Sequence, residues 1–78
     1  MKKMKYPVVL IKEHDGFVVT FPDFPEGITQ GDTVEEALYM AEDCLKLIIE
    51  TRLDFQEKIP EPLDIKNYKY FVEVEINS

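Results

Sequence analysis

The sequence predicts an α+β domain, in which a small mixed sheet of order β-β-β-α-β carries one helix on one face. Three observations lead to this class. Two short apolar runs flank an Asp-Gly turn signal, one long segment has apolar residues at helical spacing, and the last segment alternates between apolar and polar residues. The length of 78 residues suits one domain, which we expect to span residues 1–78.

The first two strands should form a hairpin. Residues 6–12 and 17–21 are the apolar runs, and the Asp15-Gly16 pair between them favours a tight turn. Apolar side chains fall on both faces of these runs, which suits a strand in the middle of a sheet. Pro22 ends the second strand, and a short edge strand is expected at residues 28–30.

A long amphipathic helix should follow at residues 33–55. Asp32 is a favourable N-cap residue, and Glu35 stands three positions later, as in a capping box. The apolar positions recur at helical spacing and predict a buried stripe. The stripe consists of Val34, Ala37, Leu38, Ala41, Leu45, Ile48 and Ile49.

The chain should end on a strand at residues 68–76, reached through an extended connector that contains Pro60 and Pro62. Because a helix precedes this strand, we expect it to run parallel to a strand of the hairpin, through a right-handed crossover. One helix covers only one face of the sheet. The residues expected on the uncovered face are Val9, Ile11, Val18 and Phe71. Exposed apolar patches usually mark interfaces, so we expect a homodimer, a higher homo-oligomer or a protein partner there.

The charge of the chain is strongly acidic, with a formal net charge of −7 from 16 acidic and nine basic residues. Residues 1–12 hold four lysines and no acid, whereas residues 13–64 hold 14 acids. An acidic domain repels phosphate backbones and attracts basic partners. The plainer alternative is that the acids only keep a small protein soluble. We interpret Lys2, Lys3 and Lys5 as part of a frayed terminus rather than as nucleic-acid contacts.

The expected compartment is the cytoplasm. No apolar run is long enough to span a bilayer, and no long apolar segment follows the N-terminal lysines as in a signal peptide. A single cysteine, Cys44, cannot form an internal disulfide, which suits a reducing compartment.

Catalytic groups are sparse, so we expect no enzyme, no metal site and no cofactor. His14 lies in a turn beside Asp15, with no nucleophile near it in sequence. Cys44 borders the buried helix stripe and has no second cysteine to share a metal. Glu73 and Glu75 alternate with the core-facing positions of the last strand, which is typical of a solvated face rather than of metal ligands.

The middle of the chain resembles the HicB-like antitoxin family. The residues that carry the resemblance are Phe17-Val18-Val19-Thr20-Phe21-Pro22-Asp23-Phe24-Pro25, Thr29-Gln30-Gly31-Asp32-Thr33, Glu35-Glu36-Ala37 and Ile59-Pro60-Glu61-Pro62. The resemblance covers about residues 6–62, and it implies a truncated ribonuclease-H-like sheet. One departure is visible, since Glu26-Gly27 stands where members often carry a Gly-Cys pair.

The resemblance implies an antitoxin of a type II toxin–antitoxin system. In that family the partner is HicA, a small basic ribonuclease that cleaves mRNA with a histidine, and the antitoxin masks its active site. The candidate contact residues, chosen for exposure and charge, are Asp23, Phe24, Glu26, Glu35, Glu42 and Asp43. Many members continue into a DNA-binding domain. Because this chain ends at Ser78, we expect it not to bind nucleic acid directly.

Two alternatives remain open at this point. The chain could be an orphan HicB-like homo-oligomeric domain whose partner is not a toxin. The less favoured alternative is a divergent metal-dependent nuclease, which would need several carboxylates converging on metal ions.

Overall fold

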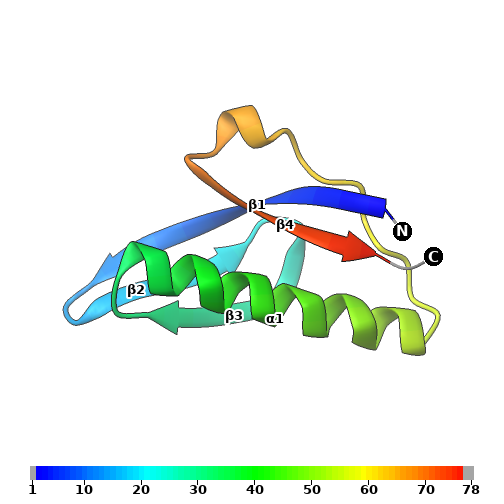
Figure 1. Cartoon of the computed structure of the whole chain (residues 1–78), viewed down its shortest axis with the longest axis horizontal. Coiled ribbons are helices and arrows are strands. Elements are labelled where there is room, and N and C mark those ends of the chain that lie inside the picture. Colours follow the sequence, from blue (N-terminus) through cyan, green and yellow to red (C-terminus); the bar gives the residue numbers. More distant parts are fainter. Residues whose placement is uncertain (1, 77–78) are drawn as a thin grey trace.

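The elements follow the predicted order in the computed structural model, which describes residues 2–76 (Figure 1). The bounds are β1 (Lys2–Glu13), β2 (Gly16–Phe21), β3 (Phe24–Gly31), α1 (Val34–Asp54), the short 3₁₀ helix η1 (Ile65–Asn67) and β4 (Tyr70–Ile76). This arrangement confirms the α+β class. In the described residues no helix is both long and apolar enough to cross a membrane.

The four strands form one sheet in the order β3-β2-β1-β4, and every neighbouring pair is antiparallel. The predicted mixed sheet is therefore wrong. The crossover rule gives the handedness of a connection between parallel strands, and it does not determine whether the strand after a helix runs parallel. Here residues 55–69 first carry the chain back beyond β1, so that β4 begins opposite Val8 and ends opposite Lys2 (Figure 1).

The long strand β1 forms the centre of the sheet. Its first part, Lys2–Val8, pairs with β4, and its second part, Val9–Glu13, pairs with β2. The prediction of a frayed terminus is therefore wrong for the lysines. Lys3 and Lys5 stand opposite Glu75 and Glu73, and cross-strand pairs of opposite charge stabilise a sheet.

The N-terminus of α1 lies one residue later than predicted. The N-cap is Thr33, whose Oγ1 accepts a hydrogen bond from the Glu36 backbone N–H at 3.0 Å. The Glu36 carboxylate in turn accepts from the backbone N–H of Asp32 at 3.0 Å. A capping box is present, but it is formed by Thr33 and Glu36 rather than by Asp32 and Glu35.

The core lies between α1 and one face of the sheet, as the apolar stripe predicted. The helix contributes Ala37, Ala41, Leu45 and Ile49, and the strands contribute Met4, Tyr6, Val8, Val19, Phe21, Phe24, Val72, Val74 and Ile76. The junction of β3 with α1 is especially close. A Cβ atom on Gly31 would lie 2.4 Å from the Ala37 backbone nitrogen, so only glycine fits there.

The opposite face of the sheet is only partly covered. Ile11 is 46% exposed and Phe71 is 44% exposed, and Val9 and Val18 lie half-buried on the same face. Pro7, which pairs in register with Phe71, is buried, and η1 contacts β1, so the connector covers the middle of this face. The expected apolar patch is present, while its role as an interface stays a prediction.

Candidate protein-binding surface

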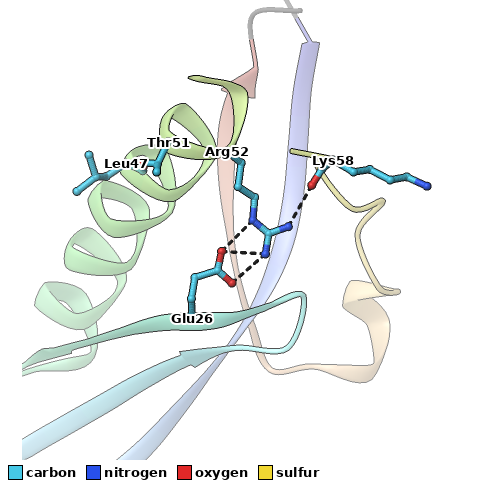
Figure 2. A network of polar contacts seen from close by, with 5 residues as sticks. All are labelled: Glu26, Leu47, Thr51, Arg52 and Lys58. Atoms are coloured by element: carbon cyan, nitrogen blue, oxygen red, sulfur yellow. Dashed lines mark hydrogen bonds and ion pairs between the residues drawn. The ribbon is translucent and has the colours of Figure 1, made fainter. Parts of the chain in front are cut away.

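The start of β3 is joined to the end of α1 by Arg52. The guanidinium group donates from Nε and from one terminal nitrogen to the two carboxylate oxygens of Glu26, both at 2.8 Å. Its other terminal nitrogen donates to the backbone carbonyl of Lys58 at 3.1 Å. Figure 2 shows Arg52 placed between these two partners. The Arg52 side chain therefore connects α1 both to β3 and to the connector, residues 55–69.

Glu26 and Arg52 each stabilise the charged form of the other. The hydrogen bonds from Arg52 hold the pKa of the Glu26 carboxyl below its usual range, and those to Glu26 raise the pKa of Arg52. The Arg52 side chain is only 19% exposed, and its guanidinium carbon lies 4.9 Å from the centre of the Phe24 ring. This cation–π contact adds to the two hydrogen bonds.

A second set of contacts fastens the connector to the same region. The Tyr6 hydroxyl donates to the Pro60 carbonyl at 2.7 Å, and the Asp23 carboxylate accepts from the Leu63 backbone N–H at 3.2 Å. Burial, with the nearby charges of Asp23 and Glu61, raises the pKa of Tyr6 to about 12. The Tyr6 and Phe24 rings meet edge to face, with centroids 5.0 Å apart.

These contacts change the interpretation of three predicted contact residues. Phe24 is 0% exposed, so the expectation of an exposed side chain there is wrong. Although Phe24 follows a turn, its apolar ring is buried, because it packs in the core beneath that turn. Asp23 and Glu26 already hold intramolecular partners. This corner of the molecule therefore holds the connector in place.

The other predicted acids lie along α1, where Glu35 and Asp43 are exposed and Glu42 is half-buried. Glu42 forms an ion pair with Lys46 at 3.5 Å, one helical turn later. Glu35 and Glu42 line a groove between α1 and β4, whereas Asp43 does not. The structure therefore does not bring the six predicted residues together.

The groove between α1 and β4 is a surface that the sequence interpretation missed. One hollow, of about 380 Å³, lies between the C-terminal half of α1 and the end of β4, and a second lies between the N-terminal half of α1 and the start of β4. Glu42 and Glu73 line both. The sequence predicts a solvated strand face at Glu73 and Glu75, and only the strand order shows that this strand is an edge of the sheet beside the helix.

The other chemically interesting side chains have ordinary surroundings. His14 is almost fully exposed, 3.9 Å from Asp15. Burial raises the pKa of the Cys44 thiol, which lowers its thiolate fraction and its reactivity. Within residues 2–76, no three His, Cys, Asp or Glu side chains are grouped so that they could hold a metal ion.

Comparisons with known proteins point to one family. Residues 5–78 match the family described as HicB_like antitoxin of bacterial toxin-antitoxin system. Antitoxin HicB 1 of Photorhabdus laumondii is 52% identical over 63 residues, which are 80% of this chain and 41% of that protein. Antitoxin HicB of Escherichia coli is 37% identical over 75 residues, 95% of this chain and 54% of that protein. The chain thus spans about half the length of these relatives.

A solved structure supports the same grouping. A chain of a toxin–antitoxin complex from Streptococcus pneumoniae superimposes with a TM-score of 0.77 at 26% identity, over 87% of this chain and 50% of that chain.

Proposed function

Since the chain belongs to the HicB-like antitoxin family, we propose that it captures a small basic toxin of the HicA type and neutralises it by masking its active site. The toxin would be an mRNA-cleaving ribonuclease, and the cytoplasm, where mRNA is found, would be the site of action. The observation that carries the proposal is the family match over residues 5–78, together with the likeness to a chain of a toxin–antitoxin complex.

The charge of the chain supports a basic partner. A formal net charge of −7 on 78 residues attracts a basic protein over a distance of about 10 Å at ordinary ionic strength, and it accelerates their encounter. A toxin that binds RNA needs a basic surface, and an acidic protein that covers this surface also excludes the RNA. Masking therefore requires no catalytic group from the antitoxin.

The test is a toxin-capture experiment with purified components. The wild-type chain is mixed with a HicA-type toxin, complex formation is measured by calorimetry, and cleavage of a labelled RNA is followed at increasing ratios of chain to toxin. We expect cleavage to stop near stoichiometric ratios. A chain that neither binds the toxin nor slows cleavage, while it remains folded by circular dichroism, would overturn the proposal.

A second candidate function is favoured by the partly covered sheet face. Ile11, Ile28 and Phe71 are 46%, 67% and 44% exposed, and apolar side chains gathered on one face of a sheet are typical of an interface. An orphan homo-oligomeric domain with a non-toxin partner would use such a face. Self-association without any capture of HicA-type toxins would favour this alternative.

A further inference from the structure

We propose that the groove between α1 and the outer edge of β4 binds an extended basic segment of the partner protein, which adds to the sheet as a strand next to β4. The identification of the partner as a toxin rests on the proposed function, whereas the mode of binding rests on the geometry of the groove. Peptide binding by strand addition uses backbone hydrogen bonds for affinity and side-chain pockets for specificity.

The two hollows form a single groove along the edge of the molecule. The first is lined by one side of α1 between Glu42 and Leu53, by Glu73–Ile76 on β4 and by Lys3 on β1. The second is lined by one side of α1 between Glu35 and Glu42 and by Phe71–Glu73 on β4. They share Glu42 and Glu73, so the groove follows β4 along most of its length. Seven residues in β4 correspond to an edge of about 24 Å at roughly 3.4 Å per residue.

The outer edge of β4 is available for backbone pairing. Within residues 2–76, β4 pairs only with β1, and the register runs without a shift from Lys2–Ile76 to Val8–Tyr70. About half of the N–H and C=O groups of an edge strand point away from the sheet. By contrast, β3, the strand at the other edge, has a register shift in its pairing with β2 at Thr20/Phe21 and contains Pro25, which lacks an N–H.

The walls of the groove are acidic and its floor is apolar. Five glutamates and two lysines line it. Lys46 is paired with Glu42, and Lys3 stands opposite Glu75 on the neighbouring strand β1, so the acids remain in excess. The glutamates are Glu35, Glu42 and Glu50 on the helix and Glu73 and Glu75 on the strand. Ile49, Val74 and Ile76 form part of the floor.

This pattern specifies the chemistry of the bound segment. Successive side chains of a strand point to opposite faces of the sheet. On an added strand, one set of alternate side chains would face the helix and the apolar floor, while the other set would lie beside Glu73 and Glu75. A segment that alternates between apolar and basic residues satisfies both environments. The excess of acid over base provides the complementary charge for lysine or arginine.

A second copy of the chain is a poor occupant of this groove. Pairing of β4 with its own copy would bring Glu73 and Glu75 of each strand beside the same glutamates of the other. Like charges opposite one another destabilise a sheet. The acidic walls therefore select against self-pairing at this edge and in favour of a basic partner.

The first test uses synthetic peptides of seven residues, matched to the length of β4. The probe alternates Lys and Val, one control alternates Glu and Val, and a second control has the Lys–Val sequence with N-methyl groups on alternate backbone nitrogens. We expect the Lys–Val probe to bind and to shift the backbone amide signals of β4 in NMR spectra, and both controls to fail. Absence of binding, equal binding of the N-methylated peptide, or shifts confined to another surface would overturn the inference.

Two charge-reversal variants test whether the Lys–Val probe binds in the groove. Glu50→Lys reverses a charge on an exposed position near the helix C-terminus, where a positive charge favours the helix, so the variant should fold. We expect it to weaken binding of the probe about tenfold, roughly 1.4 kcal/mol. Glu13→Lys makes the same charge change on an exposed residue outside the groove and should alter binding less than about twofold, since it acts only through screened long-range charge.

The same variants separate this inference from the proposed function. If Glu50→Lys weakens toxin capture and probe binding while Glu13→Lys changes neither, the inference is supported. If wild type and Glu50→Lys capture the toxin equally well, the inference is overturned and the proposed function stands. If the wild-type chain captures no toxin, the proposed function fails, and the peptide experiment alone decides whether the groove accepts a basic strand.

Discussion

Arg52 connects three parts of the molecule through one side chain. It bonds to Glu26, 26 positions earlier in the sequence, and to the carbonyl of Lys58 in the connector. The local sequence does not predict this role, because basic residues are common in the last turn of a helix, where Arg52 lies. Glu26 in β3 and Lys58 in the connector come within hydrogen-bond distance of Arg52 only in the folded chain, where both lie at the end of α1.

The Glu26→Gln variant tests the strength of this contact. An exposed ion pair contributes at most about 1 kcal/mol, and because Glu26 is 47% exposed we expect a loss of roughly 0.5–1 kcal/mol in the free energy of unfolding near neutral pH. The measurement is urea denaturation of wild type and variant. Glu13→Gln provides a control, because it removes the same charge from an exposed residue that does not contact Arg52.

The pH dependence of that loss gives a sharper check. The pKa of Glu26 is lower in the folded chain than in the unfolded chain, so its contribution is present above the unfolded pKa and is lost as pH falls through the folded pKa. The difference in stability between wild type and Glu26→Gln should therefore shrink below about pH 4, the ordinary range of glutamate. A difference that stays constant across this range would contradict the assigned ion pair.

At the scale of elements, the two ends of α1 differ in how far local sequence determines them. The N-terminus carries a capping box, which the sequence prediction placed one residue too early, at Asp32 and Glu35 instead of Thr33 and Glu36. The C-terminus has no glycine. Gln56 instead adopts a positive φ of 57°, and backbone bonds from Glu57 N–H to Arg52 O and from Gln56 N–H to Leu53 O close the last turn.

Substitutions at the two candidate cap residues distinguish them. Thr33→Ala removes the side-chain acceptor for the Glu36 N–H and should lower the free energy of unfolding by about 1 kcal/mol. Asp32→Ala retains the backbone N–H that binds Glu36 and should cost only a few tenths of a kcal/mol, from the interaction of its charge with the helix N-terminus. Thermal unfolding of both variants is the measurement, and the reverse ranking would show that Asp32 is the functional cap.

At the scale of the whole molecule, the two proposed binding surfaces adjoin at Phe71, which lies on the partly covered face and also lines the groove. The groove lies along the outer edge of β4 beside α1, and the partly covered face lies on the side of the sheet away from the helix. A homodimer formed through the part of that face around Ile11 and Val18, which do not line the groove, would leave the groove accessible. Self-association and capture of a basic partner are therefore compatible in one assembly.

The oligomer prediction is tested on the partly covered face. Ile11→Glu places a charge in the apolar patch at a position that does not line the groove, and we expect the molar mass measured by light scattering to fall from that of a dimer or higher oligomer to that of a monomer. Leu47→Glu is the matched control, because Leu47 is also exposed but lies on the helix. A wild-type chain that is already monomeric at high concentration would contradict the prediction.

The sequence by itself determined the elements and their buried sides. The helix stripe at Ala37, Ala41, Leu45 and Ile49 and the core positions Val72, Val74 and Ile76 follow from hydrophobic periodicity. The family resemblance was also readable from local order and spacing of turn and cap residues, and the comparisons confirm it. These features are local, because a few neighbouring residues define each of them.

Only the tertiary structure decided how the elements meet. The direction of β4 depends on the path of residues 55–69, and that path depends on contacts at Tyr6, Asp23 and Arg52 that join residues far apart in the chain. The burial of Phe24 and the acidic groove beside Glu73 follow from the same assembly. Strand order and edge position arise from non-local pairing, which hydrophobic periodicity along the sequence does not encode.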